Sequence, residues 1–149
     1  MFEKILIATD GSECSNRAAQ AGIDLAKLSG GKVTALYVAQ RPAAPIGGLT
    51  GGKIDEVVSG MWRAVKEEGE RATGHVEEMA RRSGVSIEKR VTEGHPASEI
   101  LRIAEETPMD TIVMGAIGKT GLTKFLLGSV AEKVVRNSKV PILIVPMPG

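Results

Sequence analysis

The chain has 149 residues, of which 42% are hydrophobic, so residues 1–149 are predicted to form a single domain around one core. Nineteen basic and eighteen acidic residues give a formal net charge of +1, which provides no overall field to recruit nucleic acid or an anionic membrane. The single cysteine excludes an intrachain disulfide, and the absence of a signal-like start or of an apolar run of roughly 18 residues leads us to expect a cytoplasmic protein.

The first third of the chain predicts two strands separated by a helix. A nearly continuous apolar run over residues 2–9 is typical of a strand that is covered on both faces of a parallel sheet. Ser12 or Ser15 can cap the helix that follows, and the glycine pair at 30–31 ends it. Residues 32–39 form the second predicted strand.

The middle of the chain predicts a loop, a long helix and an exposed strand. Residues 41–53 carry two prolines and four glycines, a composition that indicates a flexible loop or lid. Apolar residues then recur at helical spacing and predict an amphipathic helix over about residues 53–83, which Gly69 and Gly74 could bend. Residues 85–92 alternate apolar with polar side chains, so we expect a strand near an edge of the sheet.

The last third predicts a helix and two strands, with a further helix over residues 129–136 between the strands. Pro96 suits the first position of a helix that ends before Pro108. The apolar, β-branched run over residues 110–115 predicts the fourth strand. Residues 140–145 predict a terminal strand bracketed by prolines, which cannot donate to a sheet ladder.

The terminal strand also bears on assembly. If it lies at the edge of the sheet, pairing with its copy in a second subunit would cover it, so we predict a homodimer through residues 140–145. The alternative is a central, buried strand in a monomer.

Strands that alternate with helices imply right-handed crossovers and a three-layer α/β/α sandwich with a five-stranded parallel sheet. In such sheets ligands bind beyond the carboxyl ends of the strands, where the direction of winding reverses. The tip of the first strand, Thr9-Asp10-Gly11-Ser12, and the segment that begins at Gly115 are the best-equipped ends. They converge if the first and fourth strands are neighbours.

The glycine-rich segment predicts a phosphate site. Gly115-Ala-Ile-Gly118 is followed after nine residues by Gly128-Ser129, between a buried strand and an amphipathic helix. Glycines let the backbone approach a phosphate closely. Ser129 and Glu132 predict a capping box that leaves other first-turn amides free for an anion. Each residue alone could be only a turn residue or a cap, and Asp10 only a turn acid; the joint spacing favours the phosphate site.

Four other sequence patterns have simpler interpretations than a functional site. Gly118-Lys119-Thr120 resembles the end of a P-loop, but a P-loop needs a further glycine where Val113 stands, so Lys119 is interpreted as a solvated loop charge. His75 and His95 lack the spacing of a metal site. Cys14, near a helix start, could sense oxidants, but an idle or buried thiol is favoured. The aromatic residues are too few and too scattered to stack nucleic-acid bases.

Together the motifs resemble the universal stress protein family over the whole chain. The resemblance rests on the glycine spacing, the opening Ala8-Thr-Asp-Gly-Ser12, the turn Gly94-His-Pro-Ala97 and the closing Val140-Pro-Ile-Leu-Ile-Val145. In that family the glycine motif is typical of members that bind ATP. The resemblance implies an adenine nucleotide alpha hydrolase-like fold with the sheet order 3-2-1-4-5 and the nucleotide across the first and fourth strands.

The resemblance also implies roles for individual residues. The carboxylate of Asp10 would bind the ribose or help to hold a phosphate-bound metal, and the backbone of Val38 would read the adenine edge. The family often has Ser-His between the first two glycines and Arg after the second, where this chain has Ala116-Ile117 and Lys119. The residues implied to bind ATP are Ala8, Thr9, Asp10, Val38, Met114, Gly115, Gly118, Gly128, Ser129 and Val130.

These observations predict a cytoplasmic, ATP-binding universal stress protein that acts as a regulatory or signalling switch toward an unknown protein partner, with no nucleic acid or membrane partner. Occupancy would order residues 41–53 and the glycine segment. Mg²⁺ or Mn²⁺ would be bound through the phosphates, and no metal site of the protein's own is predicted. A slow ATP-hydrolysing or adenylyl-transferring enzyme is the second hypothesis, although no nucleophile with a base is found. A nucleotide-free dimer that acts through protein contacts is the third.

Overall fold

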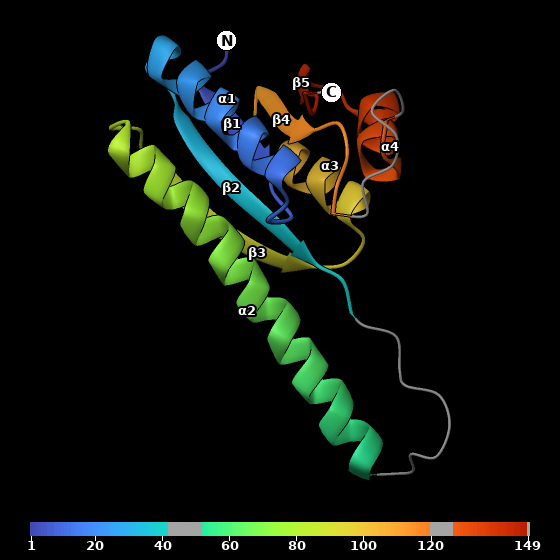
Figure 1. The fold of residues 1–149 in the computed structure, drawn as a ribbon. Coiled ribbons are helices and arrows are strands. Elements are labelled where there is room, and N and C mark those ends of the chain that lie inside the picture. Colours follow the sequence, from blue (N-terminus) through green and yellow to red (C-terminus); the bar gives the residue numbers. More distant parts are fainter. Residues whose placement is uncertain (42–51, 120–126, 149) are drawn as a thin grey trace.

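The computed structural model describes residues 1–41, 52–119 and 127–148 (Figure 1). Strands alternate with helices along the chain, as the sequence predicts. The elements are β1 (Lys4–Ala8), α1 (Glu13–Ser29), β2 (Lys32–Ala39), α2 (Gly52–Arg82), β3 (Ile87–Glu93), α3 (Pro96–Glu106), β4 (Thr111–Gly115), α4 (Ser129–Asn137) and β5 (Ile142–Val145).

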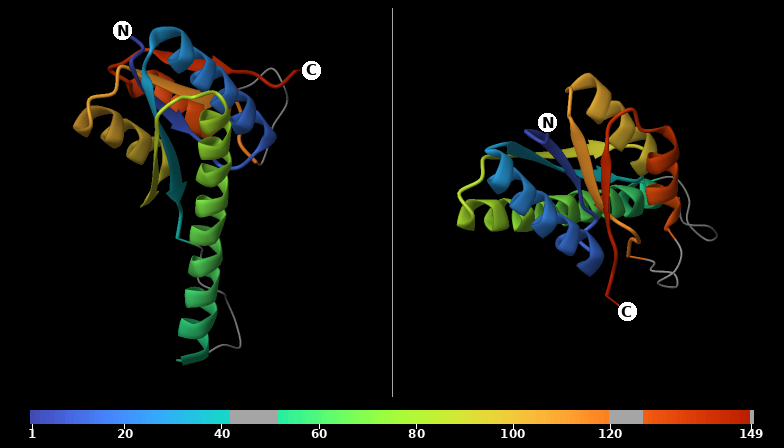
Figure 2. Two further views of the ribbon diagram at one scale, coloured as in Figure 1. Left: turned by 90° about the vertical axis from the view of Figure 1, so that its left-hand side faces the viewer. Right: turned by 90° about the horizontal axis from the view of Figure 1, so that it is seen from above.

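The strands form one parallel sheet in the order β3-β2-β1-β4-β5, which confirms the predicted order. Helices α1 and α2 cover one face of the sheet, and α3 and α4 cover the other (Figures 1 and 2). The α/β fold with three layers is therefore confirmed. Strand β1 lies between β2 and β4, at the point where the winding of the chain reverses.

The core is divided between the two faces by the alternation of the strands. In β1, Ile5 and Ile7 pack with α1 and α2, whereas Leu6 and Ala8 pack against α3 and α4. The first three of these side chains are fully buried. A strand that is buried on both faces has no solvent-exposed side where polar residues would be favoured, which explains the unbroken apolar run in the sequence.

Several element boundaries differ from the predicted ones. Strand β1 begins at Lys4, because Phe2 has a φ of 65° and cannot continue an extended strand. Strand β3 begins at Ile87, and Val85 is buried just before it. Ser12, one of the two candidate caps, is the N-cap of α1, and its side chain accepts a hydrogen bond from the amide of Ser15. The predicted loop over 41–53 falls mainly on residues 42–51, outside the described residues, and α2 begins at Gly52.

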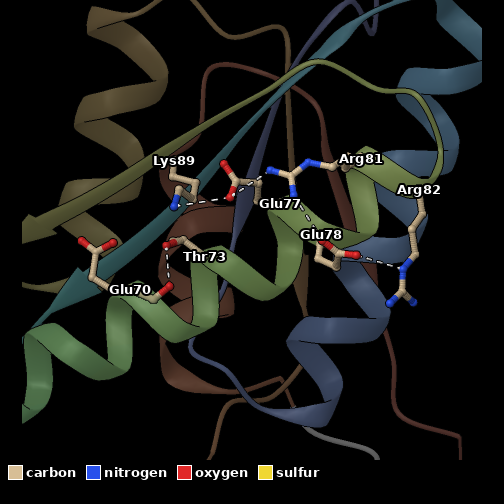
Figure 3. A network of polar contacts seen from close by, with 7 residues as sticks. All are labelled: Glu70, Thr73, Glu77, Glu78, Arg81, Arg82 and Lys89. Carbon is tan, nitrogen blue, oxygen red and sulfur yellow. Dashed lines mark hydrogen bonds and ion pairs between the residues drawn. The ribbon is translucent and has the colours of Figure 1, made fainter.

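Helix α2 runs without a break through Gly69 and Gly74, and its amino-terminal part extends past the sheet (Figures 1 and 2). A Cβ at Gly69 would lie 2.7 Å from Cδ1 of Tyr37, so the glycine allows α2 to lie close on β2. At the other end of the helix, the Glu77 carboxylate lies 3.5 Å from Nζ of Lys89 on β3 (Figure 3). This surface pair adds little stability by itself.

The two edges of the sheet are β3 and β5. The predicted exposure of β3 is confirmed, because none of its residues is fully buried. Strand β5 pairs with β4 and has no second neighbouring strand in the described part of the chain, so the alternative of a central terminal strand is wrong. The side chain of Leu143 is 40% exposed at this edge. None of the described helices is long and apolar enough to cross a membrane.

Candidate functional site

A cavity of about 550 Å³ lies at the carboxyl ends of β1, β2 and β4, within the size range of small-molecule sites. The register explains why these ends meet, since Ala8 of β1 lies beside Leu36 of β2 and Ile7 lies beside Val113 of β4. The cavity is lined by all ten residues for which the family resemblance implies a place in a nucleotide site: Ala8, Thr9, Asp10, Val38, Met114, Gly115, Gly118, Gly128, Ser129 and Val130. Contact of these residues with a nucleotide stays a prediction.

Asp10 holds two segments of the cavity wall together. Its Oδ1 accepts a hydrogen bond of 2.9 Å from the amide of Ser12, and its Oδ2 accepts one of 3.0 Å from the amide of Lys119. A carboxylate has about four lone-pair sites, so both oxygens can still accept a bond from a ligand hydroxyl. The turn role and the ligand role proposed for Asp10 are therefore compatible.

The hydroxyl of Thr9 forms hydrogen bonds within the protein. It lies 3.1 Å from the hydroxyl of Ser15 and accepts a hydrogen bond of 3.1 Å from the amide of Gly11. Gly11 has a φ of 81°, a conformation that glycine adopts without strain. Thr9 thus shapes the turn after β1 and contributes a wall to the cavity.

The glycines of the motif lie against protein atoms as well as against the cavity. A Cβ at Gly118 would lie 2.7 Å from Oδ2 of Asp10, and one at Gly115 would lie 2.8 Å from Sγ of Cys14. At Gly128 the nearest atom would be the carbonyl oxygen of Ala116, at 3.3 Å. Gly115 and Gly118 therefore allow the chain to pack closely around the cavity, in addition to any approach by a phosphate.

The predicted capping box at the start of α4 is wrong. Gly128 is the N-cap, Ser129 is the first helical residue, and no described side chain caps the helix. The amide of Gly128 donates a hydrogen bond of 2.7 Å to the carbonyl of Ala116, and this tertiary contact fixes where the helix begins. The carboxylate of Glu132 instead lies 2.8 Å from Arg136, one turn along the helix.

The cavity includes residues that the sequence analysis did not assign to it. Val65 and Glu68 of α2, Tyr37 and Gln40 at the end of β2, and Ile100 of α3 are among them. Glu68 carried a usable signal, because it is an acidic residue on the helix stripe that is otherwise formed by apolar side chains such as Val65. Its partner could not be identified from that pattern.

Lys119 is not simply a solvated charge. Its ammonium group forms an ion pair with the carboxylate of Glu68, although half of the lysine side chain is exposed. The pair joins the glycine segment to α2 along the wall of the cavity.

The pKa of the Tyr37 hydroxyl is shifted by burial and by charged groups near the cavity. Burial raises the pKa of its hydroxyl above the ordinary value of 10.0, the negative charge of Asp10 raises the pKa further, and Arg71 opposes both effects. Tyr37 therefore stays neutral near pH 7 and can donate a hydrogen bond.

The chemistry of the cavity is suited to binding. Its lining includes the two acidic residues Asp10 and Glu68, Tyr37, and the first residues of α4. Among the described residues, no group of three histidine, cysteine, aspartate or glutamate side chains is placed to hold a metal ion. Cys14 is buried, as favoured from the sequence, and its thiol donates a hydrogen bond to the carbonyl of Val145.

Comparisons with known proteins agree with this architecture. The model of the Universal stress protein family matches residues 1–146. The chain is 43% identical over 148 residues to universal stress protein MJ0531 of Methanocaldococcus jannaschii, covering 99% of this chain and 84% of that protein.

Solved structures of universal stress proteins have a similar fold. The structure of hypothetical protein MJ0577, which is a universal stress protein of Methanocaldococcus jannaschii, is similar with a TM-score of 0.84, 29% identity, and coverage of 100% of this chain and 99% of that chain. A universal stress protein in complex with cAMP is similar with a TM-score of 0.66, 25% identity, and coverage of 95% and 94%.

Proposed function

The chain belongs to the universal stress protein family, and from that premise we propose that it binds ATP in the cavity at the carboxyl ends of β1, β2 and β4 and acts in the cytoplasm as a nucleotide-dependent switch in a stress response. One observation carries the proposal: the ten residues implied to bind ATP, which come from separate parts of the chain, line a single cavity. The complex of a related protein with cAMP supports an adenine nucleotide as the ligand class.

The nucleoside half of the ligand would lie toward β2. The backbone of Val38 would meet the edge of the adenine, while Met114, which is buried, and Gly115 would form the wall beside the ribose. The carboxylate of Asp10 would accept hydrogen bonds from the ribose hydroxyls, because both of its oxygens keep acceptor capacity beside their bonds to Ser12 and Lys119.

The phosphate half would lie at the start of α4. No described side chain caps this helix, so the amides of Ser129 and Val130 can donate to phosphate oxygens, and the helix dipole favours the negative charge. The amide of Gly128 already donates to Ala116, which leaves it a positioning role. Mg²⁺ or Mn²⁺ would be held through the phosphates, and contact of the Asp10 carboxylate with that cation is the alternative to its contact with the ribose.

The same proposal includes a homodimer through β5. The strand lies at an edge of the sheet and its side chains are only partly buried or exposed. Pairing with a second copy would complete its ladder and cover Leu143. Sedimentation of dilute protein should give twice the chain mass of 15.7 kDa, and Leu143→Glu should give the monomer. A wild-type monomer would refute the dimer without affecting the nucleotide site.

The ATP site is tested on purified wild-type protein. Denaturation followed by chromatography should release adenine nucleotide, and ATP added to nucleotide-free protein should raise the melting temperature. Repeated absence of nucleotide together with no thermal shift would overturn the proposal. Incubation of the bound ATP with Mg²⁺ or Mn²⁺ for hours should leave it intact, whereas rapid turnover would favour an enzyme over a switch.

A further inference from the structure

The wall of the cavity contains a charge pair whose partners come from segments far apart in the sequence. The amide of Lys119 donates a hydrogen bond of 3.0 Å to Oδ2 of Asp10, which anchors its backbone. Its side chain then passes over Gly11, where an added Cβ would lie 3.9 Å from Cε of the lysine, and pairs with Glu68 on α2. The lysine thus contacts both of the carboxylates that line the cavity.

The pair is placed to respond to a polyanion. The side chains of Lys119 and Glu68 are 50% and 33% exposed, and ion pairs that are open to water contribute little free energy, so the lysine can change partner at small cost. A phosphate chain in the cavity would attract the lysine and repel the glutamate. Lys119 also directly follows Gly118, so a phosphate held near that glycine lies close to the root of the lysine side chain.

We propose that Lys119 exchanges Glu68 for the outer phosphates of the nucleotide, so that the site selects its ligand by the number of phosphates and prefers a triphosphate to a monophosphate. This proposal rests on the adenine-nucleotide site proposed above. In this arrangement the amides of Ser129 and Val130, at the uncapped start of α4, bind the first phosphate, so a monophosphate would not need the exchange. A triphosphate carries more negative charge and gains a charge-assisted contact with Lys119.

Glu68 has the opposite role in this selection. Its carboxylate competes with the phosphates for Lys119 and repels them when the lysine has moved. A neutral residue at this position removes both effects and frees the lysine. The two residues should therefore change the preference for ATP over AMP in opposite directions.

The test is calorimetric titration of AMP, ADP and ATP, with and without Mg²⁺, into wild type, Lys119→Met and Glu68→Gln. Lys119→Met should weaken ATP binding by about tenfold and AMP binding by less than about twofold. Glu68→Gln should strengthen ATP binding by about threefold with the same small effect on AMP. ADP should fall between the two.

Two variants remove the same charges outside the cavity. Glu67→Gln changes an exposed residue of α2 next to Glu68, and Lys66→Met removes a lysine that pairs with Glu93. Both should keep the ratio of ATP to AMP affinity of the wild type. Melting curves establish that every variant is folded.

The outcomes separate the two proposals. If wild type binds all three nucleotides and the variants at 119 and 68 leave the ratio of affinities unchanged, or shift AMP and ATP equally, the selection by phosphate number is wrong and the nucleotide site stands. If wild type binds none of the three, the nucleotide site itself is refuted.

Discussion

The two ends of the β1–β4 strand pair are each held by one aspartate, and the two aspartates work differently. At the amino ends, a single oxygen of Asp110 accepts hydrogen bonds of 3.0 Å from the amides of Glu3 and Lys4. At the carboxyl ends, the two oxygens of Asp10 accept from Ser12 and Lys119, which belong to different loops. The first arrangement joins two strand starts directly, and the second frames a cavity.

The difference shows that the same chemical group can join two strands directly or line a cavity, according to its place in the sheet. Near the amino ends the chain is so close-packed that a Cβ at Gly31 would lie 2.6 Å from the carbonyl oxygen of Glu3. At the carboxyl ends the chain continues from β1 to α1 on one face of the sheet and from β4 to α4 on the other, and described residues that follow both strands line the cavity. An aspartate at the second position can therefore meet a ligand.

The largest expected effect on ATP affinity comes from a side chain that fills the cavity at the carboxyl ends of β1 and β4. Gly118→Val adds a branched side chain whose Cβ would lie 2.7 Å from Oδ2 of Asp10, so the carboxylate must move and the Lys119 amide loses its acceptor. We expect ATP affinity to fall by about a hundredfold in calorimetric titration, because several charged contacts are lost together.

The matched control for this variant is Gly74→Val, on α2, where an added Cβ has no neighbour within 4 Å. It should bind ATP as the wild type does. Undiminished ATP affinity in folded Gly118→Val would mean that the glycine segment has only a structural role.

The next largest effect is on ATP affinity, which should fall when Asp10 is replaced and stay unchanged when Asp110 is replaced. Asp10→Asn keeps the shape of the side chain but replaces one acceptor oxygen with an NH₂ group and removes the charge. We expect ATP binding, measured by titration, to weaken by about tenfold because the ribose or the phosphate-bound cation loses a ligand. An affinity equal to that of the wild type would restrict Asp10 to the turn that it forms with Ser12.

Asp110→Asn should have the converse result. It weakens the bonds to the amides of Glu3 and Lys4, so urea unfolding should show a loss of about 1 kcal/mol in the free energy of unfolding. ATP affinity should stay within about twofold of wild type, since Asp110 is not part of the cavity. A tenfold loss of ATP affinity in this variant would mean that the two aspartates do not differ in their effect on ATP binding.

The sequence allowed the strands and the two segments that frame the cavity to be predicted because their signals are local, whereas the ten individual site residues came from the resemblance to a family. The apolar runs of β1 and β4 identify buried strands, and the polar tip at Thr9 and Asp10 follows directly after one of them. The order of the strands came from the resemblance to a family, since right-handed crossovers alone allow several orders.

What could not be predicted depends on contacts between distant segments. The Ser129–Glu132 pattern satisfies the local rule for a capping box, but the bond from Gly128 to Ala116 starts the helix one residue earlier. Glu68 meets Lys119 only because α2 packs on a face of the sheet and brings Glu68 to the wall of the cavity, and no rule of local spacing places that helix there.

The smallest expected effect is a shift in the titration of Tyr37, the single tyrosine of the chain, followed by its ultraviolet absorbance. Burial and then the charge of Asp10 raise its pKa above 10.0, so the unfolded chain loses this proton first and stability falls as the pH rises from 10 through the folded pKa. Asp10→Asn removes the second cause and leaves the first, so the pKa of Tyr37 should move only part of the way back. Asp110→Asn, at the other end of the strand pair, should leave the titration unchanged. An equal shift in both variants would mean that the pKa of Tyr37 depends on the general stability of the fold and not on the charge of Asp10.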